Sequence, residues 1–138
     1  MIINNNVMKS KILSFTLLVL VTIFMASCSH RLAGTWNVDR YETINPNEQG
    51  VSVFNIGTFV FNSNGTGEKN LKYTILGITR DDSFPFKWSW EQDKYVTIES
   101  EGSDFSKTWI IIESKKKSQK WKSTDGSNTI QVLELSKK

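Results

Sequence analysis

The side chains that most often serve as nucleophiles, general bases or metal ligands are scarce in this chain. Its 138 residues include one cysteine, Cys28, and one histidine, His30. These numbers exclude an internal disulfide, a site built from several cysteines and a histidine-rich metal cluster. A catalytic histidine also needs a fixed partner and a pocket, and His30 follows Cys28 by two residues in a segment predicted to be a tail. We therefore expect no enzyme activity, no metal and no cofactor.

One pair of neighbouring acids, Asp81 and Asp82, is a candidate for paired-carboxylate chemistry. Two carboxylates that act on one bond must flank it, as in glycoside hydrolysis. Adjacent residues of a strand point to opposite faces, so the pair is interpreted as a solvated turn. Carboxylates that converge from distant strands are an alternative that the sequence does not exclude.

Lysines cluster near the end of the chain, where five of the eight residues from Lys115 to Lys122 are lysine. Contact with anionic headgroups or lipopolysaccharide is one interpretation, because each lysine near an anionic surface contributes roughly 1 kcal/mol. The other is a solvated hairpin whose lysines block edge-to-edge pairing of strands. The acids Glu113 and Asp125 flank the cluster and favour the hairpin.

Residues 1–27 have the three parts of a secretory signal. Lys9 and Lys11 form a positive start, residues 12–25 carry no charge, and two small residues follow. The apolar run is shorter than the roughly 20 residues that a membrane-spanning helix needs. Met8 is an equally good start of translation.

The segment Met25-Ala26-Ser27-Cys28 resembles the lipobox of bacterial lipoproteins. The resemblance implies that the chain is cut before Cys28, that Cys28 is the lipid-attachment residue, and that a membrane is its partner. Surface-exported lipoproteins of the Bacteroidetes carry acids just after this cysteine, and residues 29–32 contain none. The expected location is therefore the cell envelope, on the periplasmic side of the outer membrane. An ordinary secretory signal or an uncleaved anchor helix is the alternative.

Cleavage before Cys28 would leave 111 residues with a formal charge of +1, because the removed segment holds two lysines and no acid. The basic character of the whole chain therefore gives no support to nucleic-acid binding. No nucleic-acid partner is expected.

After Leu32 the sequence shows short alternations of apolar and polar residues, separated by turn signals, and no helical periodicity of useful length. Hairpin signals such as Ser63-Asn64-Gly65 favour an up-and-down meander, and closure of the meander removes exposed edges. Residues 28–32 are expected to be a short tail. The fold predicted for residues 33–138 is all-β, a single antiparallel up-and-down β-barrel of about eight strands, with a loop over Thr43–Ser52 across one mouth.

Several short motifs resemble those of lipocalin-like barrels, of the calycin type, and in particular the small lipocalin-like lipoproteins of Bacteroidetes. The motifs are the opening Gly34-Thr35-Trp36, the strand and hairpin Gly57–Phe61 and Asn64–Gly67, the segment Phe86–Trp88 and the closing Val132–Lys138. The resemblance implies that Trp36 is a structural plug at the base of the barrel. The chain departs from full lipocalins because it has only Lys137 and Lys138 where that family has a barrel-closing arginine, and it has no room for the flanking helix.

Aromatic residues on the predicted inward faces are the candidates for a ligand pocket. In the stretch Ser83–Glu91 every second residue from Phe84 to Trp90 is aromatic, which gives one ring-rich face. The expected pocket-lining residues are Phe59, Phe61, Phe84, Phe86, Trp88, Trp90, Trp109 and Ile111. An eight-stranded barrel is at the size where side chains either fill the interior or leave room for one small ligand, so a cavity and a filled core both remain open.

A cavity and a filled core predict two different functions. With a cavity, the protein would be a lipid-anchored, non-enzymatic lipocalin-like protein that binds a small apolar ligand. With a filled barrel, it would be a protein-interaction module, such as an inhibitor or an assembly factor, that acts through the predicted loops Thr43–Ser52 and Ile78–Ser83. The sequence does not identify the ligand, the protein partner or the oligomeric state.

Overall fold

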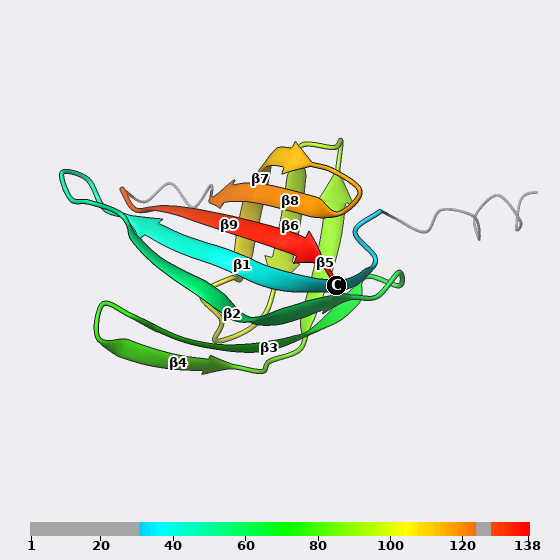
Figure 1. The fold of residues 1–138 in the computed structure, drawn as a ribbon. Helices are drawn as coiled ribbons and strands as arrows, with labels where there is room; N and C mark the ends of the chain where they lie inside the picture. Colours follow the sequence, from blue (N-terminus) through cyan, green and yellow to red (C-terminus); the bar gives the residue numbers. More distant parts are fainter. Residues whose placement is uncertain (1–30, 124–127) are drawn as a thin grey trace, which may run out of the picture. The chain divides into compact units, whose positions relative to one another are not determined.

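The computed structural model describes residues 31–123 and 128–138. The signal segment, Cys28, His30 and Asp125 lie outside the described residues. Within the described part every regular element is a strand (Figure 1). The strands are β1 Gly34–Ile44, β2 Val51–Phe61, β3 Thr66–Ile75, β4 Ile78–Asp82, β5 Phe86–Glu91, β6 Tyr95–Glu99, β7 Lys107–Ser114, β8 Ser118–Ser123 and β9 Ile130–Lys137.

Eight of the nine strands close into an antiparallel barrel. β1 pairs with β2 on one edge and with β9 on the other, and β2 in turn pairs with β3. The remaining neighbours run in the order β9-β8-β7-β6-β5-β3. This confirms the predicted all-β barrel of about eight strands, and the turn at Ser63-Asn64-Gly65 joins β2 to β3 as expected.

The ninth strand, β4, interrupts the simple meander. β4 and β5 pair one after the other with β3, β4 along Leu71–Ile75 and β5 through only Thr66 and Gly67. Between them, Pro85 has no amide hydrogen for a ladder, and β5 starts at the next residue. The segment Ile78–Ser83, which was expected to be a loop, is therefore mostly strand.

The barrel has a closed end and a flared end (Figure 1). At the closed end, backbone hydrogen bonds join Lys138 to Thr35 and Lys137 to Lys117, each at 2.9 Å. At the flared end, the last pair between β2 and β3 is Gly57 with Leu71, and beyond it the two strands separate. The 45–50 turn and the Leu76-Gly77 turn form the tips of the flared end.

Gly57 allows the close approach at which the flare begins. Its φ is +139°, and a Cβ atom placed there would lie 1.9 Å from the carbonyl oxygen of Asn70 in β3. Only glycine fits such a contact between two strands. Any side chain at this position would force β2 and β3 apart earlier and shorten their ladder.

Trp36 is fully buried at the closed end, where a structural plug was expected. Its indole Nε1 donates to the carbonyl oxygen of Leu32 at 2.8 Å. The Lys137 ammonium lies 5.4 Å from the Trp36 ring centroid, which is within the range of a cation–π interaction. A lysine therefore covers this tryptophan in a chain that lacks the arginine of the lipocalin pattern.

Candidate functional site

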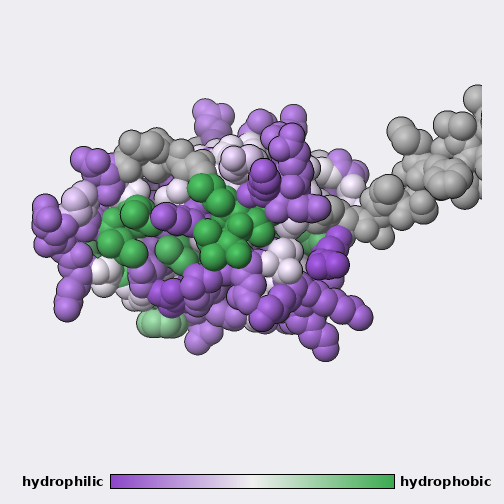
Figure 2. All heavy atoms as spheres, turned by 90° about the horizontal axis from the view of Figure 1, so that it is seen from above, coloured by the Kyte–Doolittle hydropathy of each residue, from purple (hydrophilic) through white to green (hydrophobic). Residues whose placement is uncertain are grey.

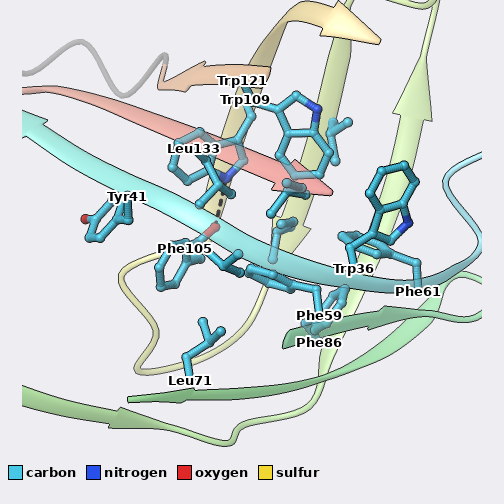
Figure 3. Close-up of a cluster of buried hydrophobic side chains, with 14 of the residues drawn as sticks. Trp36, Tyr41, Phe59, Phe61, Leu71, Phe86, Phe105, Trp109, Trp121 and Leu133 are labelled. Atoms are coloured by element: carbon cyan, nitrogen blue, oxygen red, sulfur yellow. Dashed lines mark hydrogen bonds between the residues drawn. The ribbon is translucent and has the colours of Figure 1, made fainter. Parts of the chain in front are cut away.

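Four of the predicted pocket residues, Phe59, Phe61, Phe86 and Trp109, meet inside the barrel (Figure 3). None of them exposes more than 3% of its surface. The rings of Phe59 and Phe61 are stacked with centroids 5.7 Å apart, and Phe86 meets their edges at 5.6 and 5.2 Å. At these distances aromatic rings are in contact. The side chains that were expected to line a cavity thus fill this part of the barrel themselves.

Three further predicted residues, Trp88, Trp90 and Ile111, pack against the core from partly buried positions. Trp88 donates to the carbonyl oxygens of Asn62 and Thr66, both at 3.0 Å. The Trp90 indole donates to the Asp93 carboxylate at 2.7 Å. Both polar ring edges are therefore used within the fold.

Phe84 does not share the inward face of β5, because it precedes the strand, and it is 47% exposed. Its ring lies 5.8 Å from the Lys69 ammonium, and the Phe86 ring lies at 5.9 Å. The Lys69 ammonium is therefore bordered by one ring from the link between β4 and β5 and by one ring from the start of β5. The expectation of four inward aromatics in a row is wrong at this residue, since the break at Pro85 turns the chain.

A buried ion pair occupies the wall next to these rings. The Lys69 ammonium donates to the Asp82 carboxylate at 2.8 Å and to the Ser100 hydroxyl at 2.7 Å, and the lysine side chain is fully buried. The second carboxylate oxygen of Asp82 accepts from Ser103 at 2.5 Å. The interpretation of Asp82 as part of a solvated turn is therefore wrong, whereas Asp81 is exposed, on the opposite face.

This ion pair links β3 and β4 to the turn that follows β6. Ser100 and Ser103 belong to the 100–106 turn between β6 and β7, so the pair holds that turn against β3 and β4. The same turn carries Phe105, which is fully buried and whose ring contacts those of Tyr41 and Phe59. Lys69 thus donates to a carboxylate and to the Ser100 hydroxyl, and that hydroxyl in turn donates to the Pro85 carbonyl at 2.9 Å.

Polar groups reappear inside the barrel towards the flared end. The Tyr73 hydroxyl donates to Asp104 at 2.8 Å. Burial, together with that bond to a carboxylate, raises the pKa of Tyr73 far above its usual value. Nearby, Gln131 donates to the Tyr41 hydroxyl at 2.9 Å and accepts from Lys107. The filled aromatic core therefore ends in a layer of hydrogen-bonded tyrosines.

Beyond this layer, apolar side chains reach into solvent at the flared end. The exposed fractions are 64% for Phe54, 62% for Leu76, 53% for Ile78 and 37% for Val51. Leu76 has φ +51° in the two-residue turn that joins β3 to β4. Such turns favour asparagine or glycine, and a leucine with positive φ is uncommon. The chain thus keeps an exposed leucine at a position where its backbone is unfavourable.

A second apolar surface lies on the outer wall over β7, β8 and β9 (Figure 2). Strand register places Tyr95, Ile110, Lys122 and Val132 in one row across four strands. Ile112 on β7 is 54% exposed beside this row. Lys122 lies between Ile110 and Val132 in this row, so the apolar surface of the outer wall is interrupted by a charge.

An open groove of about 740 Å³ lies outside the barrel over the short junction of β3 and β5. Its lining includes the three acids Glu68, Glu99 and Glu101 and the cation Lys87. Such a mixed, charged lining differs from the mostly apolar lining of small-molecule pockets. The hollow lies where only two residue pairs join β3 to β5, so the barrel wall has few backbone contacts at this place.

Sequence reasoning missed Lys69 and Phe105, and it named Asp82 but not as the partner of a buried lysine. Lys69 follows Gly67 and precedes Leu71 and Tyr73 at a spacing of two, and all of these residues are buried. The period therefore signalled an inward lysine, which requires a buried acid as partner. Nothing local identified that acid, because the pairing of β3 with β4 sets it.

Comparison of the chain with protein-family models, curated proteins and solved structures finds no match. Within residues 31–123 and 128–138, no three histidine, cysteine or acidic side chains are grouped so that they could hold a metal ion. The same residues include no helix with the length and hydropathy that crossing a membrane requires.

Proposed function

We propose that this protein is a lipid-anchored, non-enzymatic binding module of the bacterial cell envelope, similar in build to small lipocalin-like lipoproteins. Its barrel is a filled scaffold, and its binding surface is the flared end. Leu76 is the observation that carries the proposal, because it is an exposed apolar residue held at a positive φ. Backbone strain that stability does not require is typical of binding sites.

The partner that fits this surface is an apolar segment of another envelope protein. Leu76 and Ile78 are exposed at the tip of a two-stranded projection, so a ligand inside the barrel could not bury them. A protein surface that covers them would remove their apolar area from water, and each Å² so buried would contribute about 25 cal/mol to the free energy of binding. The anchor at Cys28 comes from the lipobox resemblance and is part of the proposal.

A small apolar ligand is the second candidate, and it has its own supporting observation. Val53 and Ile75 pack at the edge of the core near Tyr41 and Tyr73, whose rings meet edge to face at 5.6 Å. These residues would form a shallow apolar floor at the mouth. Such a ligand would contact the mouth and not the aromatic residues Phe59 and Phe61.

Two matched variants of the full chain test the proposal. Leu76→Asn and Ile112→Asn make the same kind of change at residues of similar exposure, one at the flared end and one on the outer wall. The protein is extracted gently from the envelope, and the size and composition of its complex are compared with those of the unmodified chain. Loss of a stoichiometric partner with Leu76→Asn alone is the expected result. Loss with Ile112→Asn alone would assign binding to the outer wall.

A further inference from the structure

Three separate segments bring basic residues together at the closed end. We call this set the basic collar, and its members are Arg31, Lys115, Lys116, Lys117, Lys137 and Lys138. All six side chains are exposed. The backbone bonds from Lys137 to Lys117 and from Lys138 to Thr35 fix the segments side by side. The sequence cluster at Lys115–Lys117 is therefore half of a larger basic surface.

Most of the collar lacks a neutralising acid. Glu113 pairs with Lys115 at 2.7 Å. Within the described part of the chain, Arg31, Lys116, Lys117 and Lys138 form no ion pair. Lys120, which belongs to the same sequence cluster, instead meets Glu134 on the outer wall at 3.6 Å. Within the described residues of the sequence cluster, Lys115 and Lys120 are therefore paired with acids, whereas Lys116 and Lys117 at the closed end are not.

The covalent chain limits how far the collar can lie from an anchor at Cys28. Arg31 is the third residue after Cys28, and an extended chain spans at most about 3.6 Å per residue. Arg31 therefore stays within about 11 Å of the acylated cysteine. This upper limit is slightly longer than the Debye length of about 8 Å at physiological ionic strength, so the tether allows Arg31 to come within one Debye length of the headgroups, where their charges would act on it.

We propose that the basic collar contacts the anionic phospholipid headgroups of the bilayer that holds the anchor. The inference rests on the proposed function, because it takes acylated Cys28 as the anchor. The contact orients the barrel with its closed end on the membrane and its flared end, with Leu76, away from it. A binding surface at the far end is then presented to partners in the surrounding compartment.

The test uses the processed full chain, reconstituted in vesicles of phosphatidylcholine with or without phosphatidylglycerol. A thiol-reactive fluorophore is placed at Lys116→Cys or, as the matched control, at Leu76→Cys, and the vesicles carry a quencher on their headgroups. An acylated Cys28 has no free thiol, so each variant is labelled once. Strong quenching at position 116 in anionic vesicles, reversed by high salt, with none at position 76, is the expected result.

A charge-reduced variant separates lysine contact from simple nearness to the anchor. Lys117→Ser combined with Lys138→Ser should lower the equilibrium constant for headgroup contact of the label at 116 by about 30-fold, since each lysine contributes a factor of roughly five. Equal quenching in neutral and anionic vesicles, or no effect of these two changes, would overturn the inference while the anchor stands. An unmodified Cys28 in the mass of the N-terminal peptide would instead overturn the proposed function, and the inference with it.

Discussion

At the closed end of the barrel the strands pair on both edges, and Trp36 is fully buried beneath the Lys137 ammonium. At the flared end β2 and β3 have separated, and Leu76 and Ile78 project into solvent from a two-stranded hairpin. One end thus buries its large side chains and the other exposes them. In the function that we propose, the closed end and the core supply stability, and the flared end supplies the binding surface.

Two phenylalanines of β2 test this division most strongly. Phe59 is fully buried, whereas Phe54 is 64% exposed five residues earlier on the same strand. Phe59→Ala should lower the free energy of unfolding by about 3–5 kcal/mol, since it leaves a cavity among packed rings. Phe54→Ala should change it by no more than about 0.5 kcal/mol. Urea unfolding measures both, and similar losses would break the comparison.

The buried ion pair of Lys69 with Asp82, which holds the 100–106 turn against β3 and β4, should come next in effect. Lys69→Met leaves the Asp82 carboxylate buried without its cation, and we expect a loss of about 3 kcal/mol in the free energy of unfolding. Adding Asp82→Leu to this variant removes the unpaired charge and should restore most of the stability. A Lys69→Met protein as stable as the original would show that the pair does not hold the 100–106 turn.

At the tip of the flared end, a substitution should raise stability. Leu76→Asn relieves the backbone at φ +51°, because asparagine adopts this conformation more readily. The midpoint of urea unfolding should shift to a higher urea concentration, because the free energy of unfolding rises by about 1 kcal/mol. Partner binding should fall at the same time. A variant that loses stability would mean that Leu76 contributes to folding, and it would remove the argument for a binding role.

The smallest expected effect is on the outer wall, where neither end is involved. The hydrogen bond from Arg40, followed by the charges of Arg40 and Lys120, holds the pKa of Glu134 below its ordinary value. A lowered folded pKa gives stability that is present above the ordinary glutamate pKa and is lost as the pH falls through the folded value. Both side chains are partly exposed, so the contribution should stay below about 1 kcal/mol.

Arg40→Gln is the measurement for this effect. The variant should be slightly less stable than the original chain at pH 7, and the difference should shrink as the carboxylate is protonated at acidic pH. Unfolding by urea at both pH values gives the comparison. A difference that grows at acidic pH would contradict the assigned sign.

The sequence predicted the barrel because its evidence is local. Alternation placed Phe59 and Phe61 on one face, and Asn64-Gly65 marked a hairpin. Each signal depends on residues within a few positions. The structure confirms these elements, and it adds β4, which is short and polar and carried no apolar period of its own.

The candidate site was less predictable because it depends on partners far apart in the sequence. Lys69 meets Ser100 across 31 residues, and the collar joins Lys117 to Lys137. Whether an inward ring lines a cavity or fills it depends on all the rings that face it, such as Phe86 and Phe105 against Phe59. No alternation pattern within a single strand contains that information.

Native mass spectrometry of the processed protein, extracted from the envelope, tests the filled scaffold most directly. For a filled scaffold we expect the mass of the polypeptide from Cys28 with its acyl chains, and no bound small molecule. An additional mass that is released on denaturation, and that is lost with Phe59→Leu but kept with Leu76→Asn, would contradict it. That result would place a ligand among the core aromatics and transfer binding from the flared end to the barrel interior.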